Sequence, residues 1–126
     1  MIYGIGIDLV DVSRMQAILG KWQGRFRDRI FSAYEIDYCE TKKVPAVHYA
    51  ARFAVKEAFL KCLGMGLWSG LALKDIEVVN GPDGAPSIKL HRRPQAELEK
   101  IGSPSTHVSI SHTDTHATAI VILEKK

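Results

Sequence analysis

The chain begins with an apolar segment that includes two glycines and then an acidic residue. From residue 2 to residue 12 most positions are aliphatic, and many are β-branched, which favours a buried β-strand. Gly4 and Gly6 lie two residues apart and so share one face of that strand, and Asp8 continues the same face. Glycine weakens a strand, so this pair indicates close approach by another backbone or a ligand. A carboxylate on so apolar a strand needs a partner.

Three helical segments are predicted to follow in the first half of the chain. Ser13 is placed to cap a helix over residues 13–22. The spacing S-x-x-E at residues 32–35 is that of a capping box and predicts a second helix that reaches residue 40. The longest helix is expected over residues 45–63, with proline at its start and Gly64 as its C-cap.

The second half of the chain changes to shorter, strand-like segments. Residues 75–79 and 86–91 are separated by a turn rich in glycine, proline and aspartate, which predicts a β-hairpin. Residues 94–101 form a short predicted helix, and a second hairpin is expected from residues 107–112 and 116–124. Together these elements predict an α+β fold, in which a small antiparallel sheet packs against the long helix.

The last predicted strand is apolar on both faces, since alanine, isoleucine, valine and leucine occupy most positions from residue 117 to 123. A strand of this kind is covered on both faces. The chain has 126 residues, which fit a single domain over residues 1–126, and it offers few helices to cover two faces. We therefore expect another subunit to supply part of the cover.

Composition excludes several classes of protein. Hydrophobic residues make up 46% of the chain and charged residues 25%, values that are typical of globular proteins and not of disordered or fibrous ones. There is no apolar run of ~20 residues and no basic segment before the first strand, so we expect neither a membrane partner nor a signal peptide. Cys39 and Cys62 have no metal-binding spacing, and a reduced, cytoplasmic protein is expected.

The net charge of +3 is unevenly distributed. Five cations fall between residues 14 and 29 against the single acidic residue Asp28: Arg14, Lys21, Arg25, Arg27 and Arg29. This basic segment follows directly after the two acidic residues at positions 8 and 11, which suggests a docking surface for an acidic partner beside a metal or catalytic spot. The alternative is a solvated helix face, and charge alone does not choose between the two.

The strongest candidate for catalytic chemistry lies on the long helix. Phe53, Glu57 and Lys61 follow one another at i, i+4 spacing and so line one helix face. An ordinary Glu–Lys helix pair is the simplest interpretation. However, this face is the apolar one, and packing against the first strand would bring Asp8 and Glu57 together. Two carboxylates that leave room for water and phosphate oxygens suit Mg²⁺, and a neighbouring lysine can neutralise a transferring phosphoryl group.

The strand over residues 107–112 carries a second, weaker candidate. Alternation places His107, Ser109 and Ser111 on one face and His112 on the other. Hydroxyls and an imidazole at the end of a strand could hold a phosphate or an adenine edge, although a hairpin with a polar outer face is the simpler explanation when the strand is taken alone. No paired histidine spacing indicates zinc, and no G-x-S-x-G sequence indicates a serine hydrolase.

These residues together resemble one family. Gly-Ile-Asp at residues 6–8, followed about 45 residues later by FAVKEAFLK at residues 53–61, is similar to the signature of the 4′-phosphopantetheinyl transferases. The whole chain, through to the closing VSISHTDTHATAIVILEK, resembles the short bacterial type of that family, the holo-[acyl-carrier-protein] synthases. The resemblance implies transfer of 4′-phosphopantetheine from coenzyme A to a serine of apo-acyl carrier protein, for fatty acid biosynthesis, with release of adenosine 3′,5′-bisphosphate. It also implies a homotrimer with active sites between subunits.

The resemblance assigns roles to individual residues. Asp8 and Glu57 match the Mg²⁺ ligands, and Glu57, directly or through a water on the metal, is also the candidate base. Lys61 matches the lysine at the coenzyme A diphosphate. Further coenzyme contacts are expected at Lys56, Gly64, Ser111 and His112, and carrier docking at Arg14, Lys21, Arg25 and Arg52. Two other classes remain open: a Mg²⁺-dependent phosphohydrolase with the same carboxylates, and a nucleic-acid-binding module with the basic segment. The latter lacks an aromatic stacking platform, so we do not expect a nucleic acid partner.

Overall fold

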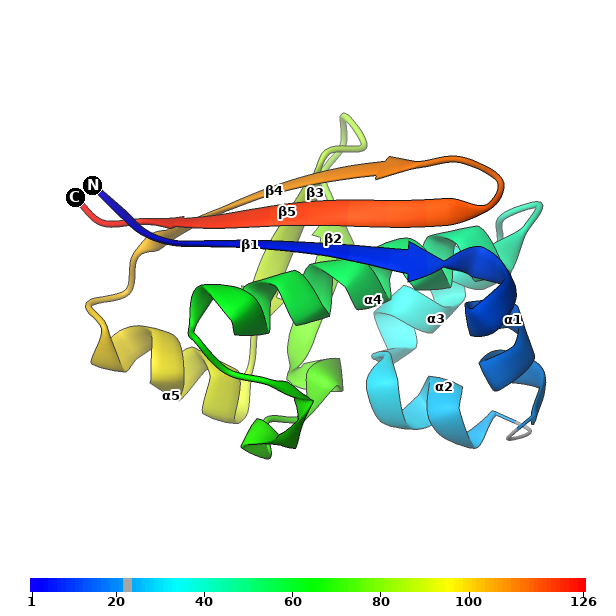
Figure 1. The fold of residues 1–126 in the computed structure, drawn as a ribbon, viewed down its shortest axis with the longest axis horizontal. Coiled ribbons are helices and arrows are strands. Elements are labelled where there is room, and N and C mark those ends of the chain that lie inside the picture. Colours follow the sequence, from blue (N-terminus) through cyan, green and yellow to red (C-terminus); the bar gives the residue numbers. More distant parts are fainter. Residues whose placement is uncertain (22–23) are drawn as a thin grey trace.

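Helices and strands account for most of the residues that this computed structural model describes, which are 1–21 and 24–126 (Figure 1). In chain order they are β1 (Ile2–Asp11), α1 (Val12–Lys21), α2 (Arg25–Ile30), α3 (Ala33–Glu40), α4 (Pro45–Cys62), the 3₁₀ turns η1 (Leu67–Ser69) and η2 (Leu73–Asp75), β2 (Ile76–Asn80), β3 (Pro86–Leu90), α5 (Arg92–Lys100), β4 (Ser105–His112) and β5 (His116–Glu124). The predicted α+β class is confirmed. None of the described helices is long and apolar enough to cross a membrane.

The strands form two antiparallel sheets, where the sequence led us to expect one. The larger sheet has the order β1-β5-β4, and β2 pairs with β3 in a separate two-stranded sheet. In the larger sheet Asp8 lies opposite Ala119, and Gly6 lies opposite Val121. Helix α4 runs along one face of this sheet, which we call the inner face, while α1, α2 and α3 gather at the N-terminal end of α4 (Figure 1).

The two glycines of β1 allow α4 to lie directly against the sheet. A Cβ atom on Gly6 would lie 1.9 Å from the carbonyl oxygen of Ala58, and one on Gly4 would lie 2.4 Å from that of Cys62. Both distances are far below van der Waals contact, so any side chain would push the helix away. The predicted close approach is confirmed, and the approaching backbone is α4. As a result Asp8, on the same face, is held next to this helix.

The opposite, outer face of the larger sheet is apolar and open to solvent in the single chain. Ile5, Ile7 and Leu9 of β1 are 56%, 61% and 65% exposed. On β5 the inner-face residues are buried, whereas Ile120 and Ile122 on the outer face are half-buried. The prediction that β1 is a buried strand is therefore wrong for the isolated chain, because no element of the described structure lies over this face.

Two further differences concern helix starts near the N-terminus. Asp11, and not Ser13, caps α1, because its Oδ1 accepts hydrogen bonds from the backbone N–H groups of Ser13 and Arg14 at 2.9 and 3.2 Å. Trp22, the predicted end of this helix, lies outside the described residues. Helix α2 was not predicted, and it contributes Phe26 and Ile30 to the core. The capping box that begins α3 is confirmed.

Candidate active site

Asp8 and Lys61 meet where β1 passes over the C-terminal half of α4. Lys61 Nζ donates hydrogen bonds to the carbonyl oxygen of Ile7 at 2.8 Å and to Asp8 Oδ1 at 3.3 Å. The Lys61 side chain is 53% exposed, whereas that of Asp8 is only 12% exposed. The second carboxylate oxygen, Asp8 Oδ2, is buried and has no hydrogen-bond partner among the described residues. A buried anionic oxygen of this kind is costly unless a cation or a proton satisfies it.

Glu57 supplies a second carboxyl group at the same place. Burial, followed by the hydrogen-bonding and Coulombic effects of the neighbouring Asp8 carboxylate, raises the pKa of Glu57 from 4.5 to about 7, while Lys61 acts in the opposite direction. A carboxyl group whose charge is disfavoured by a neighbouring carboxylate is stabilised in its charged form when a cation binds between the two. The described residues include no cluster of three or more His, Cys, Asp or Glu side chains. Two carboxylates with the remaining positions open are nevertheless a donor set that fits Mg²⁺.

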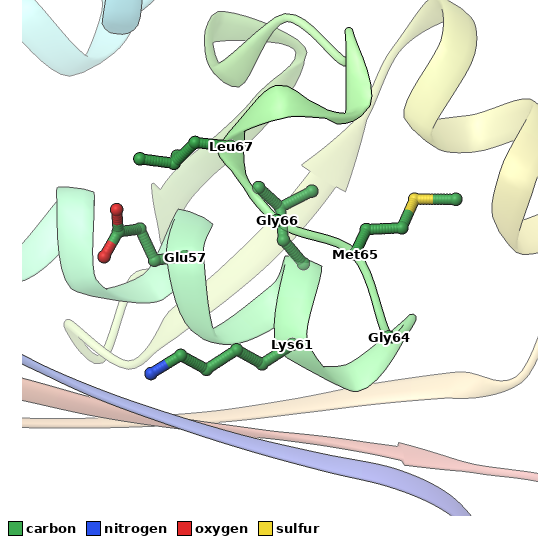
Figure 2. A pocket seen from close by; sticks show the side chains of 7 residues that line it. Glu57, Lys61, Gly64, Met65, Gly66 and Leu67 are labelled. Carbon is green, nitrogen blue, oxygen red and sulfur yellow. The ribbon is translucent and has the colours of Figure 1, made fainter.

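A pocket opens beside these charges at the C-terminal end of α4. Its volume is about 360 Å³, and its lining residues are Glu57, Leu60, Lys61, Gly64, Met65, Gly66 and Leu67. We call it the α4 pocket. Lys61 extends from α4 toward β1, and Leu67 lies on the far wall from the helix (Figure 2). Among the described residues that line it, the ionisable ones are Glu57 and Lys61, so a bound anion would be directed toward the Lys61 ammonium.

Gly64 lies in this pocket, as the resemblance implied, and turns the chain away from α4 with a φ of 71°. The rest of the far wall, Met65 to Leu67, was not assigned from the sequence. The available signal was the pair Gly64 and Gly66, since glycine allows the backbone to approach a ligand closely.

A second hollow of about 320 Å³ lies on the other side of Glu57, against α1. Residues that line it include Asp11, Arg14, Met15, Phe26 and Phe53, and it shares Glu57 and Leu67 with the α4 pocket. We call it the α1 groove. Glu57 therefore borders two separate spaces, one beside Lys61 and one beside Arg14. A carboxyl group placed in this way can contact two substrates that enter from different sides.

The cations predicted for docking separate into exposed and buried ones. Arg14, Lys21 and Arg25 are exposed on α1 and at the start of α2. Arg52 is only 2% exposed, and the prediction that it belongs to a docking surface is wrong. Its Nη2 donates a hydrogen bond to Asn80 Oδ1 at 2.7 Å, and its guanidinium lies 4.0 Å from the centre of the Tyr38 ring.

Lys56 is also buried, so its predicted contact with the coenzyme is wrong. Its side chain has no exposed surface, and Nζ donates hydrogen bonds to Glu35 Oε1, the carbonyl oxygen of Leu73 and the carbonyl oxygen of Ile76. A lysine ammonium has three N–H groups, and all three are used inside the protein.

Ser111 and His112 lie at the far end of β4, away from the α4 pocket. The His112 ring packs edge-on against His48 of α4, with centroids 5.7 Å apart. His48 precedes Glu57 by nine residues, which corresponds to roughly 13 Å along a helix axis. Within one chain, therefore, the structure brings together Asp8, Glu57, Lys61 and Gly64 but not Ser111 and His112.

Comparison with known proteins agrees with this geometry. Residues 4–121 match the family described as the 4′-phosphopantetheinyl transferase superfamily. A holo-[acyl-carrier-protein] synthase from Syntrophus aciditrophicus is 52% identical over 98% of this chain and 97% of its own length.

Solved structures of two relatives have the same fold over nearly their whole length. The holo-(acyl-carrier-protein) synthase of Bacillus anthracis, in complex with CoA (3′,5′-ADP), has a TM-score of 0.81 and 33% identity, and the match covers 100% of this chain and 99% of that one. The Helicobacter pylori holo-[acyl-carrier-protein] synthase, in complex with coenzyme A, has a TM-score of 0.83 and 32% identity, with 95% and 99% covered. This chain belongs to the 4′-phosphopantetheinyl transferase superfamily, and its relatives there are holo-[acyl-carrier-protein] synthases.

Proposed function

We propose that this chain transfers the 4′-phosphopantetheine group of coenzyme A to a serine hydroxyl of apo-acyl carrier protein and releases adenosine 3′,5′-bisphosphate, as a step that supplies fatty acid biosynthesis. The observation that carries the proposal is the cluster of Asp8, Glu57 and Lys61 at the mouth of the α4 pocket. The names of its relatives, and the coenzyme A complexes of two of them, support the same reaction.

Asp8 and Glu57 are the residues that would hold Mg²⁺, because Asp8 Oδ2 lacks a partner among the described residues and Glu57 lies beside it. When bound, the ion supplies positive charge that offsets the charge of the coenzyme diphosphate. The donors are all oxygens, so Mn²⁺ fits the same chemistry. The proposed metal preference is therefore the hard divalent cations as a class.

The chain's own residues account for the proton and the leaving group. In the reaction the serine oxygen bonds to the phosphorus that carries pantetheine, and the bond from that phosphorus to the bisphosphate oxygen breaks. Glu57 borders both the α4 pocket and the α1 groove, so it is placed to accept the serine proton. Lys61 uses two of its three N–H groups in hydrogen bonds to Ile7 and Asp8, and its side chain is 53% exposed, so it is placed to stabilise the negative charge that develops on the departing phosphate.

The carrier protein is proposed to dock on the exposed cations of α1 and α2. Arg14 lines the α1 groove next to Glu57, and Lys21 at the end of α1 and Arg25 at the start of α2 are exposed as well. An acidic partner bound there would bring a serine to the groove side of Glu57 while the coenzyme occupies the pocket side.

Assembly as a homotrimer is proposed from the outer face of the larger sheet. Ile5, Ile7 and Leu9 form a contiguous apolar surface of the kind that subunits bury. A neighbouring copy is also the simplest source of Ser111 and His112 for the nucleotide end of the coenzyme, since the chain's own copies of these residues do not line its own pocket. Each active site would then contain residues from two subunits.

The decisive experiment is incubation of the purified protein with coenzyme A, Mg²⁺ and apo-acyl carrier protein, followed by intact-mass measurement of the carrier. A mass increase of one phosphopantetheine group is expected. Hydrolysis of coenzyme A with no change in carrier mass would favour the phosphohydrolase, and salt-sensitive binding to DNA or RNA with neither activity would favour the nucleic-acid module. Alanine at Asp8, Glu57 or Lys61 is expected to slow transfer by at least ~100-fold, the effect of losing one electrostatic catalytic group.

A further inference from the structure

The buried Lys56 has an arrangement that an ion pair alone does not explain. One of its three hydrogen bonds goes to Glu35 Oε1 at 2.8 Å. The other two go to backbone carbonyl oxygens, those of Leu73 at 2.9 Å and Ile76 at 2.6 Å. Glu35 is itself satisfied, since its two oxygens also accept hydrogen bonds from the backbone N–H groups of Ser32 and Val78. All three N–H groups of Lys56 are thus bonded inside the protein, and two of these bonds go to the segment that contains Leu73 and Ile76.

That stretch is the one that forms the far wall of the α4 pocket. After α4 the chain passes through Gly64, Met65, Gly66 and Leu67 and returns past Leu73 to β2; we call residues 64–76 the return segment. Before Ile76, the first residue of β2, its regular structure consists of two short 3₁₀ turns, so few backbone hydrogen bonds of its own hold it. Its first residues are tied to α4 by the bond from Met65 N–H to the Leu60 carbonyl oxygen at 2.8 Å.

Other side chains that bond the return segment are more accessible than Lys56. Arg93 donates to the carbonyl oxygen of Gly70 at 3.1 Å, and Arg92 pairs with Asp75. Arg92 is 71% exposed and Arg93 is exposed as well. Among the described residues, Lys56 is the cation that anchors this segment from a fully buried position. Water competes with exposed bonds but not with this one, so we expect the Lys56 bonds to limit its movement most.

The same turn of α4 also presents Glu57. Successive residues of a helix point about 100° apart, so Lys56 faces α3 and the return segment while Glu57 faces Asp8 and the pocket. The carboxyl group and the opposite wall are therefore held by adjacent residues of one rigid turn.

We propose that Lys56 is a positioning residue, which fixes the return segment so that the pocket wall at Leu67 stands at the correct distance from Glu57 to hold the coenzyme. This inference rests on the proposed transferase function. Lys56 touches neither substrate in this arrangement and acts through the wall. It predicts that coenzyme A binding is weakened more than carrier binding, because Gly64 to Leu67 all line the α4 pocket, whereas of these residues Leu67 alone also borders the α1 groove.

The test compares Lys56→Met with Glu35→Gln as its matched control. Lys56→Met removes all three hydrogen bonds and is expected to raise the KM for coenzyme A at least about tenfold, since a misplacement of ~1 Å at a binding site can cost ~100-fold. The KM for the carrier should rise much less, since Leu67 is shared with the α1 groove but Gly64, Met65 and Gly66 are not. Glu35→Gln leaves both carbonyl bonds available to Lys56, and it should lower thermal stability while the KM for coenzyme A stays near that of the original protein.

A purely structural role predicts a different pattern. Loss of folded protein lowers the apparent kcat and leaves both KM values unchanged, and a general distortion of the site raises both KM values by the same factor; either result for Lys56→Met overturns the inference. If Lys56→Met does not fold, the double variant Lys56→Met, Glu35→Met replaces it, because removal of both charges leaves no unpaired ion in the core. Calorimetric titration with coenzyme A alone compares the affinity of Lys56→Met and of Glu35→Gln for the coenzyme. It keeps failure of this inference distinct from failure of the transferase proposal, which is decided by the carrier mass.

Discussion

Asp8 and Glu57 show how two ordinary acidic residues become a cation site through position alone. Asp8 lies on a strand with one carboxylate oxygen buried, and its charge favours the neutral form of Glu57, which is half-buried on a helix. The pKa of Glu57 rises to about 7, and a change of this size should alter how the stability of the protein depends on pH. It leads to a prediction about the metal-free protein that does not require an activity assay.

Without metal, stability should fall as the pH rises between about 4.5 and about 7. In this range the folded protein holds a proton on Glu57 that the unfolded chain has released, so the slope of stability against pH is negative. The melting temperature in EDTA, followed across this pH range, measures the slope. Glu57→Gln cannot titrate and should remove it, and a slope that persists in this variant would assign the effect to other groups. Addition of Mg²⁺ should reverse the trend, since metal binding displaces the proton.

Gly6 is the residue that decides how close the two carboxyl groups lie. Replacement by alanine would place a methyl group 1.9 Å from the Ala58 carbonyl oxygen, so β1 and α4 must separate. We expect a loss of about 1–3 kcal/mol in the free energy of unfolding, the usual cost of overpacking, together with weaker Mg²⁺ binding.

Gly20 provides the matched control for this prediction. It lies in α1, where an added Cβ would meet nothing within 4 Å, so Gly20→Ala should raise stability by about 0.5–1 kcal/mol. Urea denaturation of both variants measures the difference. Equal effects at the two glycines would show that β1 tolerates a side chain and that the contact with α4 is not essential.

At the scale of elements, helix α4 accounts for both what the sequence predicted and what it did not. Its limits and the face that carries Glu57 and Lys61 followed from capping residues and from i, i+4 spacing, which are local signals. Its burial did not, because α4 is covered on nearly all sides by strands and by other helices. Arg52 and Lys56 therefore look like solvent-facing cations in the sequence, and only their distant partners Asn80 and Glu35 reveal them as internal.

Helix α2 escaped prediction for a related reason. It has six residues and no side-chain cap, so its start at Gly24 resembles the end of the preceding helix. The spacing of Phe26 and Ile30 was the available signal, and both pack into the core. Helix α2 matters for function, because α1 and α2 together display the exposed cations proposed for docking.

Charge reversal at Arg14 should therefore affect one substrate only. Arg14→Glu is expected to raise the KM for the carrier and weaken its dependence on salt, because fewer charges are then neutralised on binding. The KM for coenzyme A should remain as it is, since the α4 pocket lies on the other side of Glu57. Steady-state kinetics at two ionic strengths measure both values. Lys89→Glu on β3 is the matched control, an exposed cation outside this surface. A similar loss in that variant would point to net charge as the cause.

At the scale of the whole molecule, the outer face of the larger sheet is the feature that one chain leaves incomplete. The pattern of β5 already indicated cover on both faces, and the structure shows which side lacks it. The sequence did not reveal that β1 contributes most of the exposed apolar surface, because alternation along a strand gives faces but not what lies against them. The separation of His112 from the α4 pocket also concerns the whole molecule, because in the proposed assembly a neighbouring copy supplies this residue.

If copies of the chain assemble through this face, a charge there should break the assembly without harm to the chain itself. Ile5 is 56% exposed in the single chain, so Ile5→Arg costs little within it, but in a trimer the guanidinium would be buried without a partner. Sedimentation at micromolar concentration should show a trimer for the original protein and a 14.0 kDa species for the variant. Val44→Arg, at an apolar position that is 49% exposed and lies away from the sheet, should remain assembled. Transfer activity should fall together with assembly in Ile5→Arg, because each site would lose the neighbour's Ser111 and His112. A fully active monomer would show that one chain contains the complete site.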